Sequence, residues 1–184
     1  MSTNNPTCPT GCDSYLIDVS FDYCDPSIEF GEIDHIYVMA QSGSNLLDWE
    51  SLNVWNARKA LDPTTDTDAI IDLHVMGDLP VKESDEIEIS LGRKIQTPST
   101  FTINFEIDDV SEENYDFMRW LECNTVFKIW FSANEVLFGG NTGIEVNLHG
   151  SYQIERGQKS VQKIVGTAKW EGKFSPERTT NPMA

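Results

Sequence analysis

Several short segments of this chain alternate strictly between apolar and polar residues, and this alternation limits the fold more than any other feature. Residues 101–108, for example, read FTINFEID, with an apolar side chain at every odd position. The pattern recurs in 86–91 and 144–154, and in a looser form, with some apolar residues at the intervening positions, in 126–131 and 164–170. Because successive side chains of a strand point to opposite faces, a period of two predicts strands with one buried and one solvent-facing side.

Further strands and two helices complete the predicted elements. The apolar residues of 28–38 and 70–76 indicate two more strands. One helix is expected after a cap at Asp48, with Trp55 on its apolar face. A second helix is expected over 111–122, where acidic residues in the first turn suit the positive end of the helix dipole.

Two segments between the predicted strands have the composition of connections. Residues 92–100 (GRKIQTPST) are interpreted as a connecting loop, and the glycines of 139–143 (GGNTG) predict a tight turn. Short connections favour antiparallel neighbours. The predicted fold is therefore mainly β: an antiparallel β-sandwich or small barrel with one or two flanking α-helices.

Length and composition indicate one folded domain. The chain has 184 residues, of which 39% are apolar, and this suffices for a single core. Residues 1–27, which contain several prolines, are interpreted as an N-terminal arm, and 28–174 as a single β-sandwich or barrel domain. Residues 175–184 (SPERTTNPMA) are expected to form a C-terminal tail outside the core, because they are polar and rich in proline.

The chain is strongly acidic, and its charge is unevenly distributed. Its formal net charge is −17, from 30 Asp and Glu against 13 Lys and Arg. Residues 1–118 hold 24 acidic and 5 basic residues, a net −19, whereas 119–184 hold 6 acidic and 8 basic residues, a net +2. Specific binding to nucleic acid or to anionic membranes is not expected, because both depend mainly on Lys and Arg. The asymmetry predicts a surface that repels anions or contacts a basic partner.

The sequence offers no membrane-spanning or secretory segment. No apolar run approaches the ~18 residues of a membrane span, and the first residues, MSTNNPTCPTGCDSY, lack the basic and apolar regions of a signal peptide. The protein is therefore expected to be soluble and made in a cytoplasm.

Cysteine and histidine do not follow a metal-binding pattern. The residues in question are Cys8, Cys12, Cys24, Cys123, His35, His74 and His149. Only the first two cysteines are close in sequence, so the second ligand pair of a zinc ribbon or finger is missing. The acidic loop 62–72 lacks the central Gly and closing Glu of an EF-hand. The sequence therefore predicts no metal and no cofactor, with each histidine in a structural role.

No motif for catalysis is present either. The chain lacks a G-x-S-x-G elbow, a Walker loop and an H-E-x-x-H segment, and nothing singles out one pair among its many carboxylates. The protein is therefore predicted not to be an enzyme. A carbohydrate-binding β-sandwich is an alternative of another class, although most of the tryptophans fall in segments where burial explains them. An acidic mimic that sequesters a basic or nucleic-acid-binding protein is a weaker alternative.

Five segments spread over roughly 28–182, most of the chain, are distinctive: FGEIDHIYVM (30–39), LLDWESLNVW (46–55), EIDDVSEENYDFMRWLECN (106–124), LFGGNTGIEVNL (137–148) and GTAKWEGKFSPERTTNP (166–182). Through these segments the chain resembles a family of virion structural proteins. The family comprises structural proteins of tailed phages of Bacteroidetes hosts and is similar to tail tube proteins. The resemblance implies a β-sandwich or barrel with a flanking helix that assembles into stacked rings, commonly hexameric, in the virion tail after synthesis in the host cytoplasm. Neck, tail-terminator and head-decoration proteins are alternatives within the same class.

In such a tube, DNA passes through the central lumen without being held, so the lining is expected to be polar and anionic. The polar faces of the strands at 86–91 and 101–108 supply the predicted lining: Glu86, Glu88, Thr102, Asn104, Glu106 and Asp108. Cationic residues of the C-terminal third are expected to meet the acidic part of the next copy: Arg156, Lys159, Lys163, Lys169 and Lys173. The expected partners are further copies of this chain together with sheath, baseplate and neck proteins. The segments 1–27 and 92–100 are expected to become ordered on an adjacent ring.

Overall fold

The structure is a computed structural model that describes residues 32–83, 86–89, 92–123, 125–153 and 162–184. The predicted N-terminal arm, residues 1–27, therefore lies outside the described residues, as do three of the four cysteines. Within the described residues, no helix is both long and apolar enough to cross a membrane.

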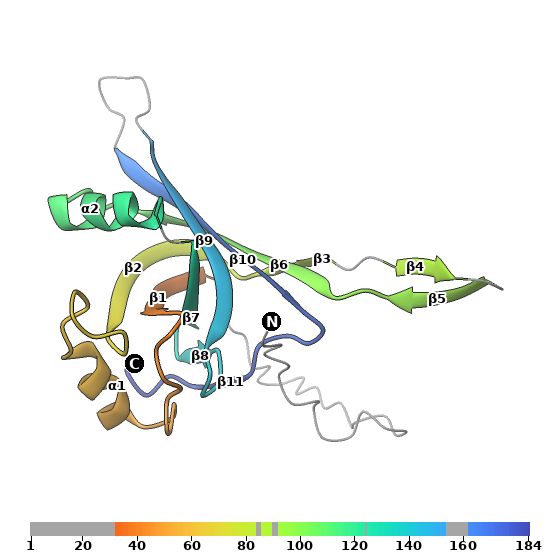
Figure 1. The fold of residues 1–184 in the computed structure, drawn as a ribbon, viewed down its shortest axis with the longest axis horizontal. Coiled ribbons are helices and arrows are strands. Elements are labelled where there is room, and N and C mark those ends of the chain that lie inside the picture. The colour runs from red at the N-terminus through yellow and green to blue at the C-terminus, as the bar shows by residue number, and fades with distance from the viewer. Residues whose placement is uncertain (1–31, 84–85, 90–91, 124, 154–161) are drawn as a thin grey trace, which may run out of the picture.

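Six antiparallel strands close into a barrel (Figure 1). In order around the wall they are β1 (Glu32–Ala40), β2 (Ile70–Asp78), β6 (Ser99–Ile107), β10 (Lys163–Gly172), β9 (Ile144–Gln153) and β7 (Val126–Ala133). Pairing of β1 with β7 over His35–Ala40 and Phe127–Ser132 joins the two ends of this series. The prediction of a mainly β antiparallel fold with flanking helices is confirmed, and of its two forms the structure adopts the barrel.

The barrel interior is a packed hydrophobic core and not a channel. All four apolar residues of the alternating segment 101–108 are buried, together with Ile36, Val38, Ile129 and Leu148 from other strands. Gly166 of β10 lies opposite Phe105 of β6. A Cβ atom at Gly166 would lie only 2.2 Å from Cζ of the Phe105 ring, so this position of the wall has no room for a side chain.

A second hydrophobic cluster lies outside the barrel wall, over β1 and β7. Tyr37 and Trp130 point outward from these strands and are covered by Trp55 of α1 (Leu52–Lys59). The Trp55 indole Nε1 donates a hydrogen bond of 2.8 Å to the carbonyl of Trp49. The indole of Trp130 donates one of 2.7 Å to the carbonyl of Gly140, in the predicted turn, so both buried indoles have partners.

The C-terminal residues belong to the fold and do not form a separate tail. β11 (Arg178–Thr180) pairs with β8 (Val136–Phe138), which in turn pairs with β7. Asn181 is buried, and Met183 packs against the outer hydrophobic cluster. The polar composition of 175–184 was therefore misleading, because backbone pairing at the edge of a sheet does not require apolar side chains.

The second helix, α2 (Glu112–Leu121), is packed against β9 and the barrel core. Its residues Met118 and Leu121 are buried in that core, and Met118 lies directly against Gly150, where a Cβ atom would come within 1.6 Å of the methionine methyl. Trp120, by contrast, is 45% exposed, so the interpretation that burial explains most of the tryptophans does not hold for this one. Its ring still packs against those of Phe127 and Phe117, with centroids 5.3 and 6.1 Å away.

Between β2 and β6 the chain first forms β3 (Val81–Glu83), which pairs with the start of β6. Beyond the barrel it continues as a two-stranded ribbon of β4 (Glu86–Ile89) and β5 (Arg93–Gln96). Residues 92–100 were predicted to be a loop, but they contain β5 and the start of β6. The sequence GRKIQTPST hides a strand because its apolar residues are few, and pairing with β4 supplies the backbone hydrogen bonds.

Candidate functional site

The ribbon is a continuation of two barrel strands, which makes it the most distinctive feature of the molecule (Figure 1). β2 pairs with β6 at Met76↔Glu106, β3 pairs with the same strand at Val81↔Thr102, and β4 pairs with β5 at Ile87↔Ile95. Relative to the pairing of β2 with β6, the pairing of β3 with β6 is shifted by one residue, and the pairing of β4 with β5 returns to the original register. These irregularities bend the strands, as bulges do, and the ribbon extends away from the barrel.

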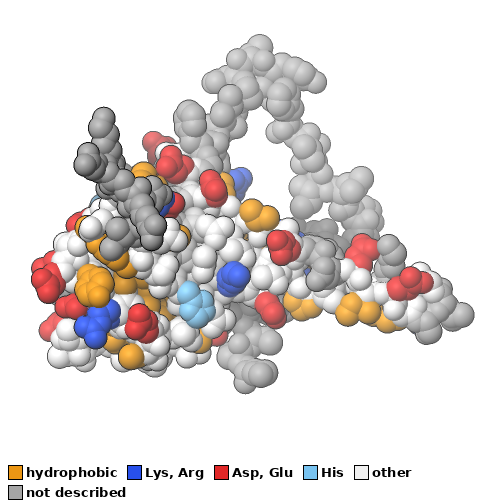
Figure 2. All heavy atoms as spheres, turned by 90° about the horizontal axis from the view of Figure 1, so that it is seen from above, with side chains coloured by type: hydrophobic (Ala, Val, Ile, Leu, Met, Phe, Trp, Pro, Cys, Tyr) orange, Lys and Arg blue, Asp and Glu red, His pale blue; other side chains and the backbone are white. Residues whose placement is uncertain are grey.

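The ribbon carries apolar side chains that nothing in the described chain buries. Ile87 and Ile95 are direct cross-strand partners, yet they are 56% and 53% exposed. The alternation in 86–91 correctly predicted strand β4, but the inference that one face of it is buried within the chain is wrong. Figure 2 shows hydrophobic side chains in a row along the ribbon. Of ten exposed large hydrophobic residues in the described part of the chain, five lie between β2 and β5: Met76, Leu79, Val81, Ile87 and Ile95.

The predicted lumen-lining residues lie in two different places. Thr102, Asn104 and Glu106 point outward from the barrel wall on β6, and Asp108 follows the strand and is exposed. Glu86 and Glu88 lie on β4 of the ribbon and are exposed. The structure therefore confirms that each of these side chains is on the molecular surface, and it divides them between the barrel wall and the ribbon.

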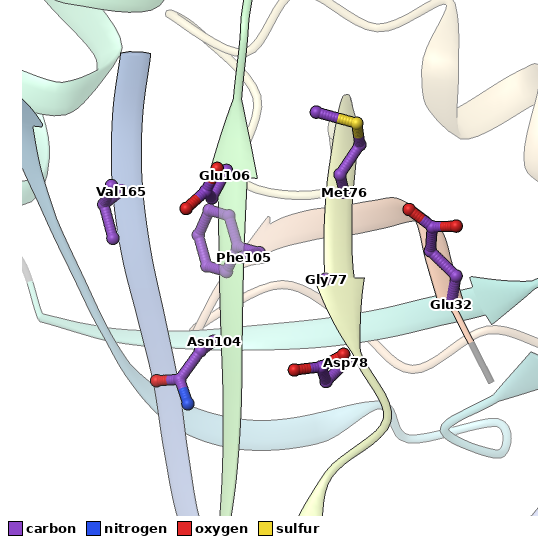
Figure 3. A pocket seen from close by; sticks show the side chains of 8 residues that line it. All are labelled: Glu32, Met76, Gly77, Asp78, Asn104, Phe105, Glu106 and Val165. Atoms are coloured by element: carbon purple, nitrogen blue, oxygen red, sulfur yellow. The ribbon is translucent and has the colours of Figure 1, made fainter.

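An open groove of about 560 Å³ lies on the surface of the barrel wall, near the point where the chain leaves β2 for the ribbon (Figure 3). Asn104 and Glu106 line it from β6, and the carboxylates of Asp78 on β2 and Glu32 on β1 lie nearby. Three acidic residues from three adjacent strands thus share this surface. The predicted acidic face is therefore broader than the sequence indicated, because β2 pairs with both β6 and β1 and so brings residues of the three strands together.

The predicted cationic residues are only partly described. Arg156 and Lys159 lie outside the described residues, whereas Lys169 and Lys173 are exposed. Lys163 donates from its ammonium to Glu106, with an N–O distance of 2.8 Å, so one predicted contact between copies is an ion pair within the chain. This pair links β10 to β6 and reduces the negative charge of the groove.

A second cavity, of about 590 Å³, is lined by outward-facing residues of β1 and β2 and by Lys59 of α1, and it contains a cluster of titratable residues. Residue pairing places His35 of β1 directly opposite His74 of β2, and their ring centroids are 4.2 Å apart. Nδ1 of His35 lies 2.7 Å from Oδ1 of Asp72, and the Lys59 ammonium of α1 donates to Oδ2 of Asp72 at 2.5 Å. Donor atoms of the two histidines and Asp72 all lie within 4.8 Å of one another.

The surroundings of this cluster modify the acidity of two of its groups. Burial opposes ionisation of Asp72, but the hydrogen bonds from Lys59 and His35 outweigh burial and hold the pKa of that carboxyl below its usual range. Burial, with a smaller contribution from the charge of Asp72, raises the pKa of Tyr37 to about 12. Of the two residues lining the cavity, Tyr37 is therefore neutral and Asp72 is negatively charged near neutral pH.

Sequence reasoning missed this cluster. It treated His35, His74 and His149 as scattered, but a residue-by-residue pairing of β1 with β2 brings the first two together. Only the register of two strands separated by a helix contains this information. The available signal was that His35 and His74 each fall within a predicted strand of the same antiparallel set.

Comparisons with known proteins add no assignment: no protein-family model matches the sequence, and no curated protein is similar to it.

Proposed function

We propose that this protein is a self-assembling structural subunit, the tail tube protein of a tailed phage, whose copies form stacked rings around a passage for DNA. The observation that carries the proposal is the ribbon: two barrel strands extend beyond their core with Val81, Ile87 and Ile95 exposed. Exposed apolar patches of this kind mark contact surfaces, because leaving them in water is unfavourable. The resemblance to virion proteins points to the same class.

The occupant of this surface is a second copy of the chain. The carboxylates that line the groove belong to the N-terminal part, of net charge −19, whereas residues 119–184 carry net charge +2. Lys169 and Lys173 are exposed in the latter part. A head-to-tail contact therefore brings opposite charges together, and head-to-tail contacts generate rings when the rotation closes.

Any passage for DNA has to lie between copies, because the interior of each barrel is filled by core side chains. The outward face of β6, with Asn104, Glu106 and Asp108, is the proposed wall of that passage. Glu32 and Asp78 join this face in the groove. Its carboxylates repel phosphates, so DNA moves along it without being held.

Electron microscopy and analytical ultracentrifugation of the purified full chain test the proposal. The wild-type protein is expected to form rings that stack into open tubes as its concentration rises. The variant Ile87→Lys/Ile95→Lys is expected to stay monomeric, because it places two ammonium groups on the contact. The matched control is Leu47→Lys, since Leu47 is 92% exposed and lies far along the chain from the ribbon.

Each result decides a different part of the proposal. Tubes of the wild type and of the control, with monomers of the double variant, support it. A double variant that assembles like the wild type refutes the role of the ribbon. Rings that never stack contradict the tube and favour a neck or terminator protein, and a wild-type protein that stays monomeric contradicts assembly altogether.

Four of the five tryptophans are buried, which disfavours the carbohydrate-binding alternative.

A further inference from the structure

We infer that His35, Asp72 and His74 form a binding site for one divalent transition-metal ion, with Zn²⁺ as the best-fitting ion. This inference is independent of the proposed tube, because all three ligands lie within a single chain and none of them lies on the ribbon. It departs from the sequence-based prediction of no metal, since the three ligands meet only when β1 pairs with β2.

The geometry provides three protein ligands on a rigid frame. His35 and His74 are held side by side by backbone pairing, and Asp72 lies two residues before His74 on the same face of β2. Their donor atoms lie within 4.8 Å of one another. Tetrahedral bonds of about 2.0–2.1 Å to Zn²⁺ place ligand atoms somewhat closer than this, and rotation of the side chains supplies the difference.

The other groups around the cavity favour a cation. Asp34 and Glu135 line it with Asp72, so three carboxylates face one ammonium, that of Lys59. Lys59 donates a hydrogen bond to Oδ2 of Asp72. Oδ1 is the atom that would bind the metal, which would replace the present hydrogen bond between Oδ1 and Nδ1 of His35. An outer partner that orients a ligating carboxylate in this way is typical of metal sites.

The donor set selects the type of metal. Two imidazole nitrogens with one carboxylate oxygen suit Zn²⁺ and its neighbours among the transition metals, whereas Mg²⁺ and Ca²⁺ prefer all-oxygen sites. Three protein ligands leave a fourth position for water, and the cavity of about 590 Å³ has room for it. Because the ligands come from two strands, the ion cross-links β1 and β2 beside the point where β1 closes the barrel.

Isothermal titration of the full chain with ZnCl₂, after removal of bound metal with EDTA, tests the site. The wild-type protein is expected to bind one equivalent, and its Tm is expected to rise at saturation, because the ligands are assembled only in the folded state. His74→Ala is expected to weaken Zn²⁺ binding by at least about 10-fold. His74 is exposed, so this substitution leaves the fold intact, as circular dichroism will verify.

The control is His149→Ala, which removes an exposed histidine from another barrel strand, β9. It is expected to bind Zn²⁺ like the wild type. A second titration uses protein whose cysteines have been alkylated, and binding is expected to persist. The inference is overturned if the wild type takes up no Zn²⁺, if His74→Ala binds as tightly as the wild type, or if alkylation abolishes binding and so assigns the ion to the thiols.

Discussion

Substitution of Gly166 by alanine probes the packing of the barrel wall more directly than any other single change. Gly166 lies on the side of β10 that faces the barrel interior, and an added Cβ would lie 2.2 Å from Cζ and 2.5 Å from Cε2 of Phe105. The Phe105 ring is 1% exposed and surrounded by the core, so it cannot turn away without displacing its neighbours. Forcing one methyl group into such a core costs about 1–3 kcal/mol of the free energy of unfolding.

The matched control is Gly172→Ala at the end of the same strand. A Cβ at Gly172 would meet its nearest heavy atom, the Phe174 carbonyl oxygen, at 3.5 Å, an ordinary contact. The control therefore lacks the steric cost and gains from the lower conformational freedom of alanine in the unfolded chain, by about 0.4–1 kcal/mol. Comparison of the two variants separates the clash with Phe105 from the general effect of replacing a glycine.

Urea and thermal unfolding, each followed by circular dichroism, give the measurement. For a chain of this size, Tm falls by about 2–4 °C per kcal/mol, so Gly166→Ala is expected to lower Tm by several degrees and Gly172→Ala to leave it unchanged or raise it. Phe105→Leu in the Gly166→Ala background is expected to recover part of the loss, because the two positions are in contact. Equal Tm values for the two alanine variants refute this account of the wall.

Two further changes test side-chain contacts outside the barrel. Asp68→Asn is expected to lower the free energy of unfolding near neutral pH by no more than about 1 kcal/mol, because solvent screens an exposed carboxylate. The effect arises because the backbone N–H and the hydroxyl of Ser44 both donate to Asp68 and hold the pKa of its carboxyl below the usual range. The folded-state pKa is lower than the unfolded one, so this contribution is present above the unfolded pKa and is lost as pH falls through the folded value. A wild-type-to-variant difference in urea midpoint that does not shrink in acid contradicts this. Trp130→Phe is expected to cost about 1–3 kcal/mol by leaving the buried Gly140 carbonyl without its donor, whereas Trp120→Phe, at an exposed ring, should stay within about 0.5 kcal/mol. Equal midpoints for the two tryptophan variants would show that the indole hydrogen bond is unimportant.

The sequence by itself determined the strands of the barrel and which of their faces are apolar. The alternation in 101–108 placed its four apolar residues correctly in the core, and the apolar face of 111–122 correctly predicted a helix there. Such patterns are local: a strand repeats every two residues and a helix every 3.6, so the period can be read without knowing the neighbours. The polar outer face of β6 follows from the same alternation.

Only the tertiary structure decided what each apolar face contacts. The same period of two occurs in 86–91 and in 101–108, yet Phe105 is buried in the barrel whereas Ile87 lies exposed on a ribbon. The meeting of His35 with His74, and the place of β11 at the edge of the sheet, likewise depend on pairing between distant segments. Register and closure arise from contacts over long stretches of chain, and no local repeat encodes them.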